Sequence, residues 1–451
     1  MSYDIKIKNG LTINLKGAAQ NIIKKAATPK TISINPSNFH LIIPKMVVKI
    51  GQKISQGDVV FFSKKDERIK FCSPVNGVVK EIIRGAKRKI IEIIIESIGD
   101  NERSSKKAID YENLSSEQVK NLLLDSGCWP FIKQRPYDII ANPSDSPKSI
   151  FISSFNSAPI SADFQIILDD QKEEFKHGVK ILSKLFSGDL NIGIEKSNKS
   201  FLNDIENVKI NTFNGPHPAG NVGVQIHHID PINSGEKVWT LGAEDVANIG
   251  RYFMTGSYNP VRTLAVSGPP VKYPKYYKTI AGSELCEIIK DAGINQNDNL
   301  RFINGDVLTG YKVESDNYLG FYNNTLSVLR EGNHYRMFGW VPFVNNKVPS
   351  IYKTSFSWLF PNKKYDLDTN LNGEERALVV TGEMEKVFPM DILPMQLLKE
   401  CMAGNIEKME SLGIYEVAPE DFSLIDYSSS SKIEAQYIIR KGLDLMISEV
   451  G

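Results

Sequence analysis

The stretch "SIFISSFNSAPISADFQIILDDQKEEFKHGVKILSKLF", residues 149–186, decides the fold class because a strand pattern passes directly into a helix pattern. Residues 149–155 have the composition of a buried strand. From Ser161, the expected N-cap, apolar residues recur at helical spacing and predict one continuous amphipathic helix. The short strand patterns "LNIGIE" and "VKINTF" follow. This alternation predicts a parallel sheet with crossover helices, which is a Rossmann-like α/β plan.

The length and composition of the chain limit the classes of protein to which it can belong. Its 451 residues predict several domains, and 41% hydrophobic with 24% charged residues is ordinary for a globular protein. A formal net charge of +1 gives no attraction to nucleic acid or to an anionic membrane. The first residues lack the pattern of a signal peptide, and no apolar run approaches the length of a membrane span. We therefore expect a chain that does not cross a membrane.

The cysteines are too scattered to suggest a cluster site. Cysteine-ligated zinc and iron–sulfur centres need grouped thiolates, so we expect neither in this chain. A disulfide framework is not expected in so long and cysteine-poor a chain, and the usage is typical of a cytoplasmic protein. The four cysteines are Cys72, Cys128, Cys286 and Cys401.

A β-rich segment precedes the α/β segment. In "VVKIGQKISQGDVVFFSKKDERIKFCSPVNGVVKEIIRG", residues 47–85, short apolar runs separated by turns predict a small β barrel or sandwich. The order of its signals resembles the biotinyl/lipoyl-type barrel-sandwich-hybrid domain. Lys64 and Lys65 lie near the hairpin position that carries the cofactor in such domains. The surrounding attachment motif is missing, so a solvated hairpin is the favoured interpretation.

Two further segments complete the predicted organisation. Residues 266–274 and 282–293 resemble the small β-grasp domain of the soluble-ligand-binding (SLBB) type. The patterns "DILPMQLLKECMAG", "IEKMESLG" and "KIEAQYIIRKGLDLMISEV" predict C-terminal helices. We therefore predict an α/β multidomain protein: an N-terminal segment with a biotinyl/lipoyl-like β barrel, a Rossmann-like domain, an SLBB-like β-grasp domain, and a linker with a C-terminal helical domain. The predicted boundaries are 1–100, 101–258, 259–335 and 336–451.

The stretch "FNGPHPAGNVGVQIHHIDP", residues 213–231, allows three interpretations. Its histidines and acid could bind a metal, but the spacing is irregular, and adjacent histidines on a regular segment cannot both face one ion. Its glycines fit neither nucleotide-binding fingerprint. It also follows a predicted strand, which places it at the carboxyl edge where α/β sheets present ligands. The interpretation as a rigid loop that aims His217 between Pro216 and Pro218 is favoured, either to contact a ligand or to brace a turn.

A second stretch, "SGCWPFIKQRPYD" (residues 126–138), combines flat apolar rings with a cation. Trp129, Phe131 and Arg135 would suit the aromatic head group of a quinone-like ligand. The same residues equally suit a protein core or a subunit interface. The sequence leaves both alternatives open.

These segments occur in an order that resembles one family, the A subunit of the sodium-translocating NADH:quinone oxidoreductases (Na⁺-NQR, NqrA family). The resemblance is carried by "SGCWPFIKQRP", "GPHPAGNVGVQIHHIDP", "VWTLGAEDVANIGRYFMTG" and "TLAVSGPPVKYP", and it covers nearly the whole chain. Many members have a histidine where this chain has Gln225, which argues further against a metal site. Related flavin-binding subunits carry a glycine-rich loop and cysteine-rich cluster motifs. This chain has "SGCWPFIKQRP" and "LIDYSSSSK" in those places.

The resemblance implies a peripheral subunit on the cytoplasmic side of the bacterial inner membrane, held there by five other subunits. The complex would oxidise NADH, reduce ubiquinone or menaquinone, and export Na⁺. FAD, FMN, riboflavin, the iron–sulfur centre and the NADH site would belong to those other subunits. This chain would then bind no cofactor, no metal and no nucleic acid, and would contain no catalytic residue of its own. Quinone contacts are predicted at Trp129, Phe131, Arg135, His217 and His227.

Two alternatives to a quinone-proximal subunit remain at this stage. The chain could be a soluble flavin- or NAD-dependent oxidoreductase that acts alone. It could also be a purely structural scaffold, in which the aromatic and histidine residues serve packing only.

Overall fold

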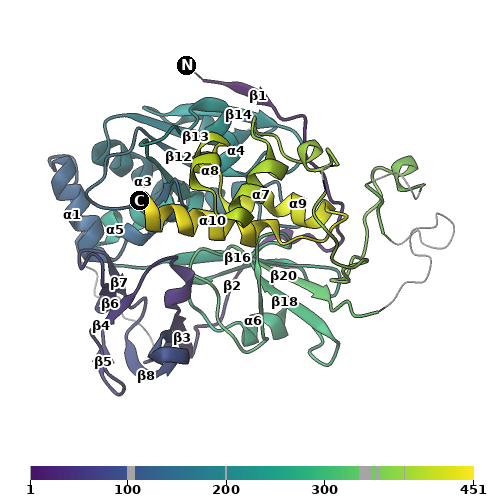
Figure 1. The fold of residues 1–451 in the computed structure, drawn as a ribbon. Coiled ribbons are helices and arrows are strands. Elements are labelled where there is room, and N and C mark those ends of the chain that lie inside the picture. The colour runs from purple at the N-terminus through teal and green to yellow at the C-terminus, as the bar shows by residue number, and fades with distance from the viewer. Residues whose placement is uncertain (1, 99–106, 199–200, 335–347, 352–355, 380) are drawn as a thin grey trace.

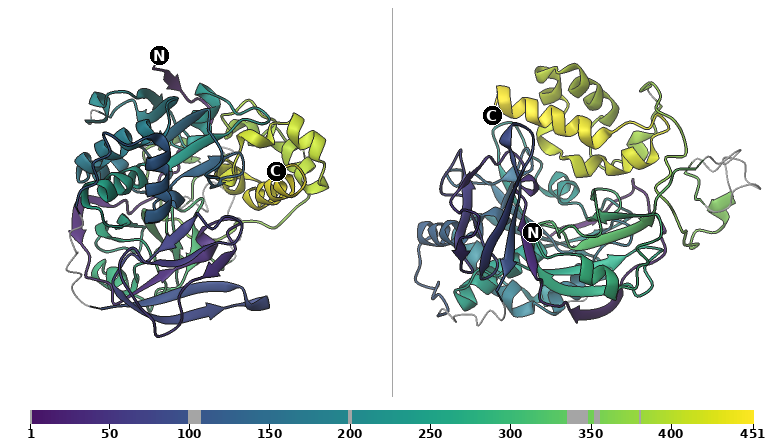
Figure 2. Two further views of the ribbon diagram at one scale, coloured as in Figure 1. Left: turned by 90° about the vertical axis from the view of Figure 1, so that its left-hand side faces the viewer. Right: turned by 90° about the horizontal axis from the view of Figure 1, so that it is seen from below.

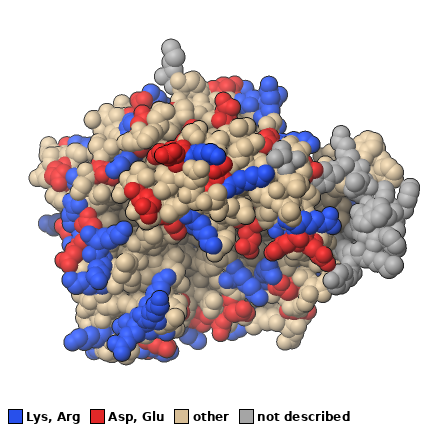
Figure 3. Space-filling model, viewed as in Figure 1, with Lys and Arg blue, Asp and Glu red and all other residues tan. Residues whose placement is uncertain are grey.

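The computed structural model describes residues 2–98, 107–198, 201–334, 348–351, 356–379 and 381–451. Figure 1 shows a small β sandwich, a larger α/β unit, a second β sheet and a group of C-terminal helices packed against one another. Figure 2 shows the C-terminal helices gathered on one side of the molecule. Positive and negative side chains are interspersed over the face drawn in Figure 3, as the near-zero net charge suggests. Among the described residues, no helix has the length and apolar content needed to span a bilayer.

Two small antiparallel sheets form the N-terminal sandwich, in the orders β3-β9-β8-β5 and β4-β6-β7. Side chains alternate between the two faces of β9: Ile93 and Ile95 have no exposed surface, whereas Ile94 between them is partly exposed and Glu96 after them is exposed. This period of two is what drives a strand to bury one face. The strands are β3 (Thr31–Ile34), β4 (Pro44–Met46), β5 (Lys53–Ile54), β6 (Val59–Ser63), β7 (Lys70–Cys72), β8 (Gly77–Arg84) and β9 (Ile90–Ser97).

A seven-stranded sheet in the order β1-β14-β13-β12-β15-β10-β11 forms the centre of the α/β unit. Its strands are β1 (Asp4–Lys6), β10 (Lys133–Arg135), β11 (Ile139–Ile140), β12 (Ser149–Ser153), β13 (Asp189–Glu195), β14 (Lys209–Asn214) and β15 (Val238–Gly242). The run from β1 to β15 is parallel, and β10 and β11 add an antiparallel edge. The parallel sheet predicted from residues 149–186 is therefore present.

Helices cover both faces of this sheet. They are α1 (Ser116–Ser126), α2 (Phe164–Asp169), α3 (Lys172–Leu185), α4 (Val222–Ile229) and α5 (Ala243–Thr255), with the 3-10 turns η3 (Trp129–Phe131) and η4 (Phe201–Asp204). On β12, Ile150 and Ile152 pack with α3 and α5, whereas Phe151 packs with α4 on the opposite face. The two helices α3 and α5 approach closely: a Cβ atom on Gly250 would lie 1.8 Å from the carbonyl oxygen of Glu174. Glycine is required at that crossing.

The single helix predicted from Ser161 is wrong in two respects. The chain forms two helices, α2 and α3, separated at Asp170 and Gln171, and the first is capped by Asp163, whose side chain accepts a hydrogen bond from the Gln165 N–H at 2.8 Å. Gln171 is fully buried and has a non-helical φ of −129°. Its side chain is held by long-range hydrogen bonds, and these tertiary contacts override the local helical pattern.

The second sheet has six strands in the order β19-β18-β20-β16-β17-β2. Its elements are β2 (Gln20–Lys25), β16 (Val261–Ser267), β17 (Lys275–Ile280), α6 (Cys286–Asp291), β18 (Leu300–Asn304), β19 (Tyr311–Val313) and β20 (Thr325–Arg330). α6 lies within residues 282–293 of the predicted β-grasp segment and buries Ile288 and Ile289 against Leu264 and Leu326 of the sheet. A strand from the N-terminal segment thus completes the sheet that follows the α/β unit.

The C-terminal helices pack against the loops at the carboxyl end of the parallel sheet. The elements are η5 (Phe356–Leu359), η6 (Met384–Lys386), α7 (Pro394–Ala403), α8 (Ile406–Ser411), η7 (Ile414–Glu416), η8 (Pro419–Phe422), α9 (Ser423–Ser428) and α10 (Ala435–Glu449). Their shared core includes Leu398, Phe422 and Leu443, together with Phe213 and Val224 of the α/β unit. Two 3-10 turns belong to the N-terminal sandwich, η1 (Pro36–Asn38) and η2 (Ala86–Arg88). Of these, η1 faces the α/β unit.

Candidate functional site

The histidine-rich stretch lies at the carboxyl end of the parallel sheet, as its place after a strand pattern predicts. β14 ends at Asn214, and α4 begins at Val222. Gly215, with φ +149°, crosses the N-terminal segment so closely that a Cβ atom would lie 2.3 Å from the carbonyl oxygen of Ile7. A side chain is therefore excluded where the loop leaves the sheet. The Leu11 N–H donates to the carbonyl oxygen of His217 at 2.9 Å, which fixes the loop from the other side.

His217 is buried within this loop, with 3% of its surface exposed. Its Nδ1 lies 3.0 Å from the Ser157 hydroxyl, which accepts a hydrogen bond from the Gly220 N–H at 2.8 Å. Among the described residues, Nε2 of the same ring is buried and has no hydrogen-bond partner. Burial lowers the pKa of His217 to about 4, so the ring is neutral near pH 7. The imidazole faces protein and braces the loop.

The other members of the stretch turn to separate partners. His227 Nδ1 lies 2.7 Å from Glu416 Oε2, and its Nε2 accepts a hydrogen bond from the Asp391 N–H at 2.9 Å. His228 Nε2 donates to the Pro389 carbonyl oxygen at 3.0 Å. In the part of the chain that the structure describes, no three histidine, cysteine, aspartate or glutamate side chains gather as metal ligands would. These histidines instead join α4 to the segment that precedes α7.

Neighbouring side chains fill the rest of the carboxyl edge. Gln225 Nε2 donates to the Ser153 hydroxyl at 2.9 Å, and its Oε1 lies 2.1 Å from where a Cβ atom on Gly193 would be. Asp421 of η8 lies against the first turn of α4, where a Cβ atom on Gly223 would be 2.6 Å from Asp421 Oδ2. Ligands in α/β proteins bind at this edge. Here the chain's own amide and carboxylate groups occupy it.

Trp129 and Phe131 are both in the interior. The Trp129 indole N–H donates to the Ala141 carbonyl oxygen at 2.7 Å, and its ring meets Trp239 edge to face at 5.5 Å. Phe131 stacks on Phe321 with 5.2 Å between ring centroids and 18° between ring planes. Aromatic pairs in such geometries add stability beyond the area they bury. The protein's own rings therefore cover the flat apolar surface that the sequence predicts for a ligand. Phe321, and not Phe131, lines the pocket that is described below.

Arg135 is also buried, and it links the α/β sheet to the C-terminal helices. Its Nη1 donates to Asp421 Oδ2 at 3.0 Å and its Nη2 to Glu420 Oε1 at 2.5 Å. The Asp421 side chain has no exposed surface, whereas 39% of the Glu420 side chain is exposed. Burial alone would lower the pKa of Arg135, but the two carboxylates outweigh it and raise that pKa above its ordinary value. The guanidinium is thus a structural cation here.

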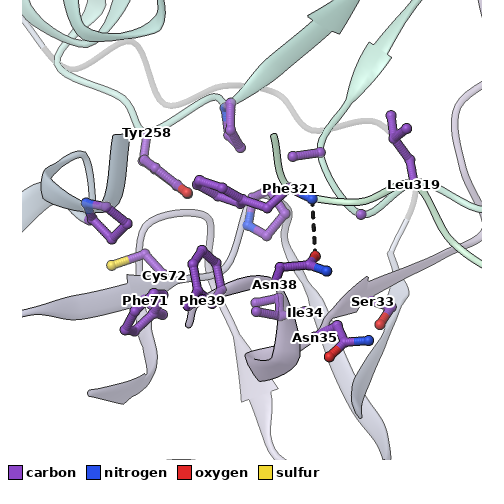
Figure 4. Close-up of a pocket in the computed structure, with 16 residues that line it drawn as sticks. Ser33, Ile34, Asn35, Asn38, Phe39, Phe71, Cys72, Tyr258, Leu319 and Phe321 are labelled. Atoms are coloured by element: carbon purple, nitrogen blue, oxygen red, sulfur yellow. Dashed lines mark hydrogen bonds between the residues drawn. The ribbon is translucent and has the colours of Figure 1, made fainter. Parts of the chain in front are cut away.

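A mostly apolar pocket opens where the N-terminal sandwich, the α/β unit and the second sheet meet (Figure 4). Its volume is about 410 Å³, counted with the open space at its mouth. The Phe39 ring lies 4.4 Å from Phe71 and 4.9 Å from Phe321 between centroids, and Tyr258 faces the same space. Asn38 Oδ1 accepts a hydrogen bond from the Phe321 N–H at 3.0 Å, which fixes one wall. Its mostly apolar lining with a few polar groups has the composition of a small-molecule site, and it is narrow, because the space that the centre of a water-sized molecule can reach is only about 20 Å³.

A charged cleft adjoins this pocket and shares Asn38 and Phe39 with it. The cleft measures about 540 Å³ with its open mouth. The ammonium of Lys133 lies 3.4 Å from Asp138 Oδ2 and 4.7 Å from the centroid of the Tyr322 ring. Burial favours the neutral acid, but Lys133 and Arg135 outweigh it and hold the pKa of Asp138 below its ordinary value.

The outer end of the cleft is closed by α10. His40 Nε2 lies 2.7 Å from Asp444 Oδ1, and the same oxygen accepts a hydrogen bond from Arg440 Nε at 3.0 Å. A slot of aromatic rings next to ammonium, guanidinium and imidazole donors suits a flat ring with polar oxygens and an apolar tail. The arrangement can orient such a ligand by hydrogen bonds to its oxygens.

Sequence reasoning found the neighbourhood of this site but missed the residues that line it. Lys133 stands two residues after Phe131 in the quoted stretch, and Asn38 and Phe39 lie in "INPSNFH", a Pro/Ser/Asn turn followed by an aromatic ring. That turn was the available signal. The residues around Phe321 carry no comparable signal, because Phe321 meets Phe39 only when separate units of the fold pack together.

Comparisons with known proteins cover nearly the whole chain. Three family models match: "NqrA N-terminal barrel-sandwich hybrid domain" at residues 5–97, "NqrA second alpha/beta domain" at 114–258 and "NQRA C-terminal domain", an SLBB model, at 263–315. The chain is 34% identical over 442 residues to the A subunit of the Na⁺-translocating NADH-quinone reductase of Photorhabdus laumondii, covering 97% of this chain and 98% of that protein.

Two further relatives carry the same name. The protein of Hahella chejuensis is 35% identical over 442 residues, with 97% of this chain and 98% of that protein covered. The protein of Vibrio campbellii is 32% identical over 449 residues, with 99% and 100% covered. Among solved structures, an NAD⁺-reducing [NiFe]-hydrogenase aligns with a TM-score of 0.39 and 11% identity over 75% of this chain and 62% of that one, which is too distant to support an argument.

Proposed function

Because relatives more than 30% identical match almost its full length, the chain belongs to the NqrA family, the A subunits of the Na⁺-translocating NADH-quinone reductases, and we propose that it forms the quinone side of such a complex. Other subunits of the reductase are its partners. We propose that they number five, carry out NADH oxidation and Na⁺ export, and hold this chain at the cytoplasmic side of the membrane.

The observation that carries the proposal is the aromatic pocket with a charged cleft beside it. The rings of Phe39, Phe71 and Phe321 offer flat apolar surface for the ring and tail of a ubiquinone- or menaquinone-like molecule. Lys133 at the head of the cleft can donate a hydrogen bond to a quinone oxygen. Apolar walls with a few placed donors are the usual composition of such sites.

The residues predicted to contact quinone take supporting roles in this proposal. Phe131 stacks on Phe321, a pocket wall, and Trp129 begins the 3-10 turn η3 that carries Phe131. Arg135 raises the positive charge near Asp138 and Lys133. His217 and His227 lie at the carboxyl edge of the sheet, and their proposed effect on quinone is through the position of the C-terminal helices.

We also propose that the flavins and the iron–sulfur centre of the complex reside in other subunits. The support is the carboxyl edge of the parallel sheet, where Gln225, His217 and Asp421 occupy the space that a cofactor would need. The strands β12, β13, β14 and β15 follow one another along the chain, and in the sheet they lie in the order β14-β13-β12-β15. That order supports the label of a Rossmann-like sheet. α7, α8, α9 and α10 support the label of a C-terminal helical domain.

The test is quinone affinity in the assembled complex. Phe321→Ala and Phe39→Ala each remove a ring wall, and we expect the KM for a short-chain quinone to rise about tenfold or more. Phe201→Ala is the matched control, because Phe201 is a buried phenylalanine that packs on Phe175 in the α/β unit. NADH oxidation with an artificial electron acceptor should stay unchanged in all three variants.

Unchanged quinone KM in both pocket variants, with the complex intact, would refute the proposal. That result would favour the scaffold interpretation, in which the rings serve packing alone. Stoichiometric flavin in the purified chain would separately contradict the proposed assignment of cofactors to the partner subunits.

A further inference from the structure

A short turn before the C-terminal helices exposes an unusual amount of apolar surface. η5 and the residue after it carry four large apolar side chains with exposed fractions of 44% (Phe356), 53% (Trp358), 52% (Leu359) and 62% (Phe360). Single exposed apolar residues are normal in soluble proteins, but a contiguous group marks an interaction site. We call residues 356–364 the aromatic turn.

The aromatic turn is anchored firmly to the body of the molecule at its C-terminal end. The Pro361 carbonyl oxygen accepts a hydrogen bond from Asn14 Nδ2 at 2.6 Å, and the Tyr365 N–H donates to the Asn14 carbonyl oxygen at 2.8 Å. The Phe360 N–H donates to the Ser357 carbonyl oxygen at 3.0 Å. The exposed fractions show that the rings face outward, and η5 lies at the edge of the molecule in Figure 1 and in the right-hand view of Figure 2.

The charge of the aromatic turn is positive. Lys363 and Lys364 follow the rings and are exposed, and residues 356–365 contain no aspartate or glutamate. The next acid along the chain, Asp366, is paired with Arg330 at 2.6 Å. The whole chain has a net charge of only +1, but the aromatic turn has an excess of positive charge beside its apolar rings.

We propose that the aromatic turn binds the surface of a bilayer that contains anionic lipid. Trp358, Leu359 and Phe360 enter the boundary between headgroups and acyl chains, and Lys364 pairs with lipid phosphate. Tryptophan rings favour that boundary, and apolar rings beside lysine are the composition of segments that lie in it. So few side chains give a weak, reversible contact, which orients a subunit whose main attachment is elsewhere.

Charge and size favour lipid over a protein partner. Lysines are complementary to lipid phosphates, and each contributes about 1 kcal/mol near an anionic surface. A stable protein interface buries about 800 Å² on each partner, which is more than a projecting turn of this length supplies. The turn is well suited to insertion of a few rings into a deformable surface.

The experiment is co-sedimentation of the purified full chain with phosphatidylcholine vesicles, with and without phosphatidylglycerol. We expect binding that requires phosphatidylglycerol and weakens as salt screens the lysines. The double variant Trp358→Ser/Phe360→Ser should lower the partition coefficient about tenfold or more. Lys364→Gln should lower it about fivefold. Tyr437→Ser is the matched control, because Tyr437 is 54% exposed on α10, and it should bind as the parent does.

Thermal unfolding should be unchanged in all these variants, because each altered side chain is exposed. The lipid proposal is overturned if the parent chain ignores phosphatidylglycerol vesicles. It is also overturned if the double variant and Lys364→Gln both bind as tightly as the control. Loss of a partner subunit from the complex in the double variant, with no vesicle binding by the parent, would identify a protein as the occupant instead.

Discussion

Replacing Arg135 by methionine should release the C-terminal helices from the α/β sheet. The guanidinium lies 3.0 Å from Asp421 and 2.5 Å from Glu420, and neither its own side chain nor that of Asp421 is exposed by more than 1%. At an effective dielectric constant of about 20, the Coulomb attraction across 3 Å is roughly 5 kcal/mol. Desolvation offsets part of this, and the loss of one partner of a buried pair costs about 3–5 kcal/mol because the other charge is left buried.

Glu420 contributes little to the free energy that is lost when Arg135 is replaced. Its side chain is 39% exposed, so water screens its interaction with Arg135, and we assign it at most about 1 kcal/mol. Most of the stabilisation therefore comes from the Asp421 carboxylate, which also accepts a hydrogen bond from the Ala418 N–H at 2.9 Å. Glu420→Gln is the matched control and should change little.

The assay is hydrogen exchange under native conditions in η8, α9 and α10. A loss of about 3 kcal/mol in the opening free energy increases exchange by roughly 10²-fold for amides that open with this unit. Amides of α3, on the far side of the sheet core, should keep their protection. A double-mutant cycle with Asp421→Asn should show a coupling energy of about 2–3 kcal/mol. Additive effects below about 1 kcal/mol would refute the assignment of Arg135 as the link between the two units.

Other perturbations have equally definite outcomes. The folded-state pKa of His217 is about 4 against 6.5 in its ordinary state, so the unfolded chain binds more protons between these values and stability falls as pH drops through that window. The loss should approach about 3 kcal/mol by pH 4 in urea titrations, and His217→Gln should remove it; an identical pH profile in the variant would contradict the buried neutral ring. Gly223→Ala should cost about 1–3 kcal/mol, because its methyl group would lie 2.6 Å from Asp421. Gly373→Ala, which meets only the flexible chain of Lys432, is its control, and equal urea midpoints would count against the close approach. Phe131→Ala should cost about 3–5 kcal/mol in the same titrations and should also raise the quinone KM; a shift below about 1 kcal/mol would show that the ring is not part of a packed core.

The parallel sheet could be predicted from the sequence because its signals are local. The strand pattern of residues 149–155, the strands that follow it and the place of the histidine-rich loop after β14 all rest on neighbours in the chain. The break between α2 and α3 could not be predicted, since the Gln171 side chain is held by Glu244, 73 residues away, and Arg251, 80 residues away. These tertiary hydrogen bonds outweigh the local helical pattern at Gln171.

The same distinction explains the candidate site. The sequence indicated Phe131 as a flat ring beside a cation, which is a property of one short stretch. It could not indicate that Phe321 covers that ring or that Phe39 faces Phe321 across the pocket, because these residues belong to separate units. Likewise, the pairing of β1 with β14 and of β2 with β17 brings N-terminal residues into two later sheets. Strands of three and six residues give no local sign of their partners.

The most direct test of the quinone site is hydrogen exchange in the assembled complex with and without a saturating short-chain quinone. If quinone occupies the pocket, amides of residues 33–39 and 319–322 should exchange more slowly with the ligand bound, while those of α3 stay unchanged. Phe321→Ala should abolish that protection at the same quinone concentration. Unchanged exchange in both segments, with protection confined to other subunits, would contradict the account.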